Sequence, residues 1–303
     1  MLKKKRNVFS QRSVLTNFLM LLPAILMIVM MFIVPLVMNF SMSFRGVKFM
    51  ESGDFIGLKN YGKLLSGSDF YHALWIMLKY TVIYTIGIFI VGFITSLILD
   101  SIKNPRLKTF FRVFYVIPYA IPDVVAAIVF TWMLDYRYGV VNYLLQNLHI
   151  LAEPMLWLTN SKMALYTVLM VEIWRQFPLH TLIIYAGLQD VPFDLYEAAS
   201  LDGAGPIRRF FYITIPYLRQ VLNILLTLTV IWSFRRFAMT WLLTKGGPAQ
   251  ATETVVVQIY NNAFINNKMG LAAAEGVLML LVTLVIVLIY LRMIKKDTQS
   301  NYN

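Results

Sequence analysis

Six stretches of the chain are apolar enough and long enough to cross a membrane as helices. About 20 mostly apolar residues make one crossing, and runs of that length recur from end to end of the sequence. The third and fourth runs are interrupted by prolines and charges, which membrane helices tolerate where neighbouring helices satisfy the freed carbonyls. The expected spans are residues 18–39, 78–99, 113–134, 163–188, 218–243 and 271–293.

The first apolar stretch is expected to stay in the mature protein as an anchor. It follows the basic run KKKR, which resembles the start of a secretory signal peptide. Its apolar run is too long for such a peptide, however, and no A-x-A-like cleavage site follows. We therefore expect an uncleaved first helix.

Composition supports a membrane protein and excludes several other classes. Hydrophobic residues make up 59% of the chain and charged residues 14%, well below the roughly 25% charged residues of a soluble domain. There is no cysteine, so disulfides and thiolate chemistry are excluded. The three histidines lie far apart and match no metal-binding spacing, and we expect no metal site. The longest loops have about 30 residues, too few for a separate core domain.

The basic residues predict the orientation of the chain in the membrane. The N-terminal tail, the 100–112 loop, the 189–219 loop and the C-terminal tail together hold fifteen Lys and Arg, and the intervening loops hold eight. Lys and Arg are concentrated in cytoplasmic loops of membrane proteins, so both termini are expected in the cytoplasm. The net charge of +12 is then a topology signal, and nucleic-acid binding is not needed to explain it.

These patterns divide the chain into four segments. We expect a cytoplasmic basic tail, then the first span with its external loop, then a core of five spans and finally a second cytoplasmic tail. Their ranges are 1–17, 18–72, 73–293, which contains a structured cytoplasmic loop at 191–216, and 294–303.

The loop between spans four and five is more structured than an ordinary connector. Asp194 with Glu197 three residues later predicts a capping box at the start of a short helix. Gly203 suits the left-handed position at the end of that helix, and Pro206 suits the first turn of a second one. In the second helix, apolar side chains at helical spacing are suited to rest on the membrane surface: Ile207, Phe210, Phe211 and Ile215.

Charged residues inside the expected spans are the main candidates for a polar site. Such charges are costly and usually face the interior of the bundle or a water-filled cavity. Glu172 and Arg175 share a helix face, and a structural ion pair between them is our leading interpretation, with contact to a substrate as the alternative. Asp123 follows a proline and either caps a restarted helix or lines a path.

Arg235 and Arg236 interrupt the fifth span. Treated as one continuous helix, that span places both too far from the outer surface for their side chains to reach it easily. We expect them to face a partner subunit, an acid such as Glu172 or Asp123, or a cavity. Arg236 is the preferred cavity residue, together with Trp232 and Ser233, and Arg235 is expected to be structural.

The motif YEAASLDGAGPIRRFFYITIP in the structured loop resembles the EAA motif of permease subunits of binding-protein-dependent ABC importers. Ile215 departs conservatively from the Leu that is common there. The resemblance extends to FIGLKNYGKLL, to RVFYVIPYAIPDVVAAIVFTWMLDYRYGVVNYLL, to VEIWRQFPLHTLIIYAGLQDVPFDLYEAA and to WLLTKGGPAQATETVVVQIYNNAF, and it indicates the carbohydrate, maltose-permease-like branch. The matching motif residues are Glu197, Ala198, Ala199, Asp202, Gly203, Ala204, Phe210, Ile213 and Pro216.

The resemblance implies the type I ABC importer permease fold, all-α with six spans, in a bacterial cytoplasmic membrane. It implies a second permease subunit in a heterodimer, two ABC ATPase subunits and an external sugar-binding protein. This chain has no phosphate-binding G-x-x-x-x-G-K-[ST] loop, so no cofactor is expected in it, and ATP and Mg²⁺ would bind to the ATPase. It implies docking to the ATPase by Glu197, Ala198, Ala199, Asp202 and Gly203.

The same resemblance implies alternating access with the sugar held near the membrane midplane. The external 244–270 loop either docks the binding protein or seals the bundle, with Gly246, Gly247, Pro248 and Tyr260 as docking candidates. The substrate-path candidates are Trp232, Ser233, Arg235, Arg236, Asp123, Glu172 and Arg175.

The substrate stays open at this stage. Related permeases resemble W-S-F-N-x-F where this chain has two arginines, and guanidinium groups match carboxylates and phosphates. An acidic saccharide is therefore one hypothesis, and a neutral oligosaccharide, with the arginines paired internally, is the other. A glycerol-phosphate-type solute is a further alternative. An intramembrane enzyme or a channel is a remote alternative, because no nucleophile–base pair or metal cluster is visible in the spans.

Overall fold

The computed structural model describes residues 11–48 and 53–300, so parts of both tails and residues 49–52 lie outside it. Within the described residues the fold is helical, and the only β pairing is an isolated bridge between Arg45 and Phe55. The all-α prediction is confirmed.

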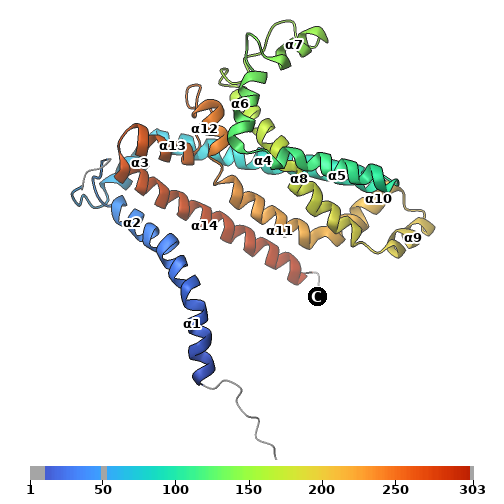
Figure 1. Ribbon diagram of the computed structural model, residues 1–303, viewed down its shortest axis with the longest axis horizontal. Helices are drawn as coiled ribbons and strands as arrows, with labels where there is room; N and C mark the ends of the chain where they lie inside the picture. The colour runs from blue at the N-terminus through green and yellow to red at the C-terminus, as the bar shows by residue number, and fades with distance from the viewer. Residues whose placement is uncertain (1–10, 49–52, 301–303) are drawn as a thin grey trace, which may run out of the picture.

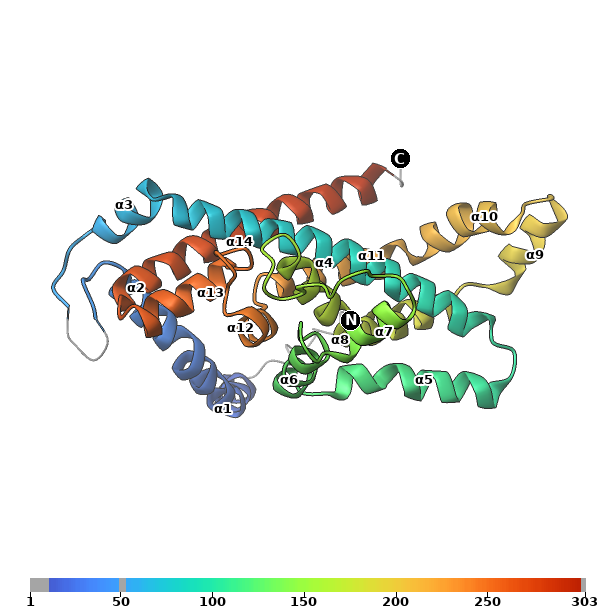
Figure 2. The ribbon, with the colours of Figure 1, turned by 90° about the horizontal axis from the view of Figure 1, so that it is seen from above.

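Four long helices form a bundle that runs the length of the molecule (Figures 1 and 2). Its members are α4 (Ser68–Ser101), α8 (Ala164–Gln189), α11 (Ile215–Ser233) and α14 (Met269–Ser300). α4 and α8 approach closely at Gly92, where a Cβ atom would lie 2.8 Å from the Cβ of His180. The core between these two helices includes Tyr84, Ile88 and Val168.

The N-terminal helix diverges from this bundle. α1 (Gln11–Ile28), a π-helical turn η1 (Val29–Ile33) and α2 (Val34–Ser43) form one continuous apolar rod. None of its most apolar 18-residue window is buried. Only the α2 end packs against α14, and α1 extends away from the other helices (Figure 1).

Two of the expected spans are broken. α5 (Pro105–Ala120) and α6 (Asp123–Met133) meet at an angle of 92°. The cause is Pro122, because a proline forces the residue before it out of the helical conformation and into an extended one. α11 ends at Ser233, and α12 (Ala238–Thr244) begins after a four-residue break. The range 218–243 was therefore wrong as one continuous helix, whereas 113–134 is broken at the proline after which a restarted helix was expected.

Short helices lie toward the ends of the bundle, and α7 projects from its side beyond α6 (Figure 1). The loop that follows α8 and the C-terminal end of α14 lie toward one end, and the loops around α3 and α13 lie toward the other (Figures 1 and 2). The short elements are α3 (Lys59–Ser66), α7 (Val140–Asn147), α9 (Phe193–Leu201), α10 (Pro206–Arg209), η2 (Phe210–Thr214), α13 (Val255–Tyr260) and η3 (Asn261–Ile265).

Fewer spans qualify on length and apolarity than the six expected. Among the described residues, four helical stretches are long and apolar enough, and the bent pair α5 and α6 makes a fifth when it is counted as one. α8 has 26 residues and would be the sixth, but its many polar side chains keep it out of this group. The four are Thr16–Ser43, Ser68–Ser101, Pro206–Ser233 and Met269–Tyr290.

Candidate functional site

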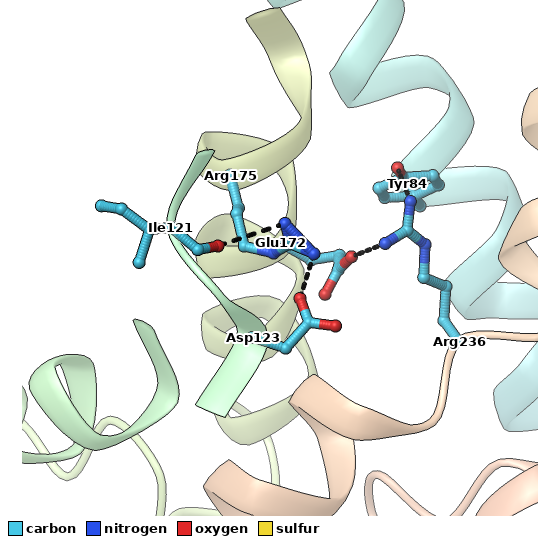
Figure 3. A network of polar contacts seen from close by, with 6 residues as sticks. All are labelled: Tyr84, Ile121, Asp123, Glu172, Arg175 and Arg236. Atoms are coloured by element: carbon cyan, nitrogen blue, oxygen red, sulfur yellow. Dashed lines mark hydrogen bonds and ion pairs between the residues drawn. The ribbon is translucent and has the colours of Figure 1, made fainter. Parts of the chain in front are cut away.

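The two helix breaks lie beside the same helix, α8, and charged side chains connect them to it (Figure 3). α12, the helix after the second break, packs against both α6 and α8. The polar residues in the middle of the spans therefore gather where two spans lose their regular backbone hydrogen bonding.

Arg236, in the second break, binds Glu172 of α8 in an ion pair. The same guanidinium donates to the hydroxyl of Tyr84 on α4 at 3.2 Å and lies 5.5 Å from the centre of that ring. The Glu172 side chain is only 1% exposed and that of Arg236 is 19% exposed. A buried carboxylate needs such a partner, because leaving one charge alone in a low-dielectric interior costs several kcal/mol, roughly 3–5 by mutation.

Arg175 of α8 makes the second ion pair, with Asp123 at the first residue of α6 (Figure 3). Its guanidinium also reaches the carbonyl oxygen of Ile121 at 3.5 Å, inside the bend. α6 has no side-chain cap, so the alternative in which Asp123 caps the restarted helix is wrong. Each break is thus joined to α8 by one arginine–carboxylate pair.

The expected pairing of Glu172 with Arg175 is wrong. The two residues share the helix, but each binds a partner from a different break, giving crosswise pairs. Each break places a residue of opposite charge next to Glu172 or Arg175 on α8. The pairs that result also neutralise Asp123 and Arg236, which would otherwise be charged without a partner inside the protein.

The two adjacent arginines have different surroundings. Arg236 is paired with Glu172, one of the acids expected as its partner. Arg235 is exposed, and within the described part of the chain its side chain has no hydrogen bond or ion pair. Ser233 is buried and donates to Thr81 of α4 at 2.9 Å, so its assignment to a cavity face is also wrong. Trp232 is half-buried.

Tyr84 and Thr81 were missed by reasoning from the sequence. Both lie in the second span, three residues apart, which places them on one helix face. Two polar side chains at that spacing in an apolar helix could have been used to predict a polar helix face. In the structure they lie on the face of α4 that contacts the break after α11.

The loop after α8 forms the two short helices expected. α9 ends at Leu201, Gly203 has the left-handed φ of +76° and Pro206 is the first residue of α10. The capping box is wrong, because α9 begins after Pro192 with no side-chain cap. Asp194 lies in the first turn of α9, where its negative charge stabilises the helix by interacting with the helix dipole and needs no hydrogen bond to do so.

α9 presents its motif residues to the surroundings and is fastened to the helices that follow. Glu197, Ala198, Asp202 and Gly203 are exposed, and Ala199 is half-buried. The Tyr196 hydroxyl is 2.8 Å from that of Thr214 in η2, and Arg209 of α10 donates to Ser200 at 2.9 Å. Since η2 continues directly into α11, these contacts connect α9 to α11.

The opposite end of the bundle carries the loop with the expected docking residues. Gly246 is buried, with a φ of +91°, and Gly247 and Pro248 are half-buried. Tyr260 packs in an aromatic cluster with Phe237, Trp241 and Phe264 at centroid distances of 4.4 to 5.0 Å. Tyr260 therefore connects this loop to α12 beside the second break rather than standing free on the surface.

No metal site is visible among the described residues, where no group of three or more His, Cys, Asp or Glu side chains is placed to hold an ion. The two ion pairs balance two carboxylates against two guanidinium groups, and the exposed Arg235 adds one positive charge. Among the described residues, this network therefore offers one unpaired guanidinium beside two neutralised pairs.

The chain matches known proteins along most of its length. The profile of the family described as "Binding-protein-dependent transport system inner membrane component" matches residues 89–297. The trehalose/maltose transport system permease protein MalF of Thermococcus litoralis is 32% identical over 279 residues, which cover 91% of this chain and 92% of that protein. The arabinooligosaccharides transport system permease protein AraP of Bacillus subtilis is 32% identical, with 91% and 87% covered.

A solved structure shares the fold. A chain of a bacterial ABC transporter involved in the import of the acidic polysaccharide alginate superposes with a TM-score of 0.83 at 20% identity, covering 94% of this chain and 96% of that chain. The EAA motif in the loop that contains α9 is typical of this family. The chain therefore belongs to the family of binding-protein-dependent transport system inner membrane components: it is an ABC permease subunit, a transport component and not an enzyme, and the ATPase is a separate subunit.

Proposed function

We propose that this chain is the membrane-spanning subunit of an ATP-driven importer that passes an oligosaccharide from an external binding protein across the bacterial cytoplasmic membrane by alternating access. The relatives named for trehalose/maltose, arabinooligosaccharides and diacetylchitobiose support the substrate class. The proposed topology has six spans, with α8 as the sixth and both termini in the cytoplasm. A second, different permease subunit, two ABC ATPases and the binding protein complete the complex.

The observation that carries this proposal is the connection between α9 and the helix breaks. α9 is fastened to η2 and α10 by two side-chain hydrogen bonds, and η2 continues into α11, which ends at the break that holds Arg236. In the proposed mechanism the ATPase moves α9, α11 moves with it, and the break changes its position against α8. Exposed Glu197, Ala198, Asp202 and Gly203, with half-buried Ala199, form the proposed ATPase contact.

At the other end of the bundle, the loop around Gly246, Gly247 and Pro248 is the proposed contact for the binding protein. Its partner helix α13 packs through Tyr260 against Trp241 of α12. Docking there would therefore reach the same break from outside. The proposed substrate path runs past that break and past the two ion pairs on α8.

Transport by the reconstituted complex tests this function. Vesicles containing both permeases and the ATPases, supplied with the binding protein, should accumulate an oligosaccharide only with ATP inside the compartment that the ATPases face. Glu197→Lys should abolish uptake, and Asp100→Lys, the same kind of charge reversal at an exposed residue of α4 outside both proposed contacts, serves as the control. Uptake that persists without ATPase subunits would contradict the proposal.

A second substrate class, an acidic saccharide, is favoured by one specific observation. Arg236 is neutralised by Glu172, so the network itself needs no anionic substrate. Arg235 lies exposed in the break without a partner in the described residues, and an unpaired guanidinium attracts a carboxylate or phosphate. Arg235→Gln should reduce uptake of a uronate-containing oligosaccharide and leave a neutral one unchanged. A wild-type complex that moves only neutral sugars would exclude the acidic class.

A further inference from the structure

A surface cleft lies on α10 and η2, immediately after α9. Its volume is about 600 Å³, and its lining residues are Gly205, Pro206, Ile207, Arg208, Phe211 and Tyr212. The apolar side chains in it are uncovered: Ile207 and Tyr212 are each 76% exposed and Phe211 is 60% exposed. Neither the ion pairs nor the α9 contacts described above use this surface.

The length of the helix indicates where the cleft lies along the membrane normal. α10, η2 and α11 form one continuous stretch of 28 residues, Pro206–Ser233, that is apolar enough to cross a membrane. About 20 residues cross the hydrocarbon layer, so roughly the first two turns project beyond it into the headgroup layer. Aromatic side chains are enriched at that level, in agreement with Phe211 and Tyr212 at this end of the helix.

Two neighbouring arginines at this level have different surroundings. Arg209 is half-buried and donates to Ser200, so it belongs to the contact between α10 and α9. Arg208 is exposed at the cleft, with its guanidinium 5.9 Å from the centre of the Tyr212 ring. Within the described residues no carboxylate pairs with Arg208, which leaves its donors available to an anion.

We propose that this cleft binds an anionic phospholipid of the cytoplasmic leaflet, its phosphate against Arg208 and an acyl chain along Ile207 and Phe211. A phospholipid satisfies both halves of the cleft at once, an uncovered apolar wall and a guanidinium beside it. Each basic side chain near an anionic membrane surface favours binding by about fivefold. The assignment of the cleft to the cytoplasmic leaflet rests on the proposed function, which places α9 on the cytoplasmic side.

The bound lipid would act on the coupling loop. α10 holds α9 through Arg209 and Ser200, and a lipid seated on α10 would fix the segment against which α9 moves. The ATPase contact proposed above is on α9, so lipid and ATPase occupy adjacent but separate surfaces.

Photo-crosslinking tests the site. The full chain, in its complex, is reconstituted in vesicles of phosphatidylcholine that contain a photoactivatable phosphatidylglycerol, and labelled peptides are identified by mass spectrometry. Labelling should concentrate on residues 205–212 and fall about fivefold in Arg208→Gln, whereas Arg106→Gln, an exposed arginine on the same side, should leave it unchanged. Ile207→Asn should also weaken the labelling.

Three results would overturn the site. Equal labelling by a photoactivatable phosphatidylcholine would show that Arg208 selects no anionic headgroup. Competition by millimolar inorganic phosphate would show a free-anion site. Labelling that appears only after the ATPase subunits are stripped from the complex would assign the cleft to the ATPase. The readout needs no transport, so lipid labelling without uptake would refute only the proposed function, and normal uptake without labelling would refute only this site.

Discussion

Replacing Glu172 by glutamine should destabilise the protein far more than the corresponding change at Asp123. Both carboxylates pair with an arginine, but the Glu172 side chain is 1% exposed and that of Asp123 is 34% exposed. Glu172→Gln leaves Arg236 as an uncompensated charge in a buried place, for which breaking a buried pair typically costs about 3–5 kcal/mol. Arg236 keeps the Tyr84 hydroxyl as an acceptor, so the low end, about 3 kcal/mol, is expected.

The other pair is only partly exposed: the Asp123 side chain is 34% exposed, but that of Arg175 is 12% exposed. Asparagine at position 123 keeps an acceptor oxygen, and Arg175 keeps the carbonyl oxygen of Ile121 as a partner. The free energy lost in Asp123→Asn should therefore be about 1 kcal/mol, the low end for a weakened buried polar contact. A double substitution, Glu172→Gln with Arg236→Gln, removes both charges and should recover part of the loss, which gives a favourable coupling energy in the cycle of about 0.5–3 kcal/mol.

The assay is unfolding of the purified complex in mixed micelles by titration with a denaturing detergent, followed by tryptophan fluorescence. Expression level of each variant in the membrane provides an independent measure. The reasoning would be refuted by a Glu172→Gln variant as stable as Asp123→Asn, or by a double variant whose loss equals the sum of the two single losses.

Three further predictions concern packing, coupling and topology. Gly92→Ala should cost about 1–3 kcal/mol of stability through overpacking, since a Cβ there would lie 2.8 Å from an α8 side chain; Gly62→Ala, with nothing within 4 Å, is the control in the same detergent-unfolding assay. Glu197→Lys should leave the isolated chain as stable as wild type but lose co-purification with the ATPase, and full retention would contradict the α9 contact. A tag at Ala249 should be labelled from outside intact cells and a tag at Ala204 should not; the reverse result would invert the orientation.

The sequence was sufficient for the helical class and the α9 loop because both depend on local signals. Apolar runs of membrane length predict helices wherever they occur. Gly203 and Pro206 specify the end of one short helix and the start of the next through their own backbone preferences, and both were placed correctly.

The break after Ser233 could not be predicted in the same way. The bend before Asp123 has Pro122 as its local cause, but the segment from Phe234 to Phe237 contains neither proline nor glycine. Its helix ends where Arg236 turns toward Glu172, so the cause lies in another helix. Apolarity alone therefore predicted an unbroken span there.

The ion-pair partners of Glu172 and Arg175 could not be predicted from the sequence for a related reason. Spacing along one helix shows which residues share a face, and it placed Glu172 and Arg175 together. It contains no information on which opposite charge another segment brings closer, and here each of the two breaks brings one. The capping box at Asp194 was wrong because the chain enters α9 directly after Pro192, a geometry that is set by the turn before it.

The crosswise pairing has a consequence for the insertion of the chain into the membrane during synthesis. In both pairs the carboxylate is synthesised before its arginine. Asp123 emerges before Arg175, and Glu172 emerges 64 residues before Arg236, so each acid enters the bilayer before its counterion exists. Nascent chains released between Glu172 and Arg236 carry that acid without its partner, and they should be recognised and degraded by quality-control proteases. Charge balance is completed only when the chain has been made past its last break.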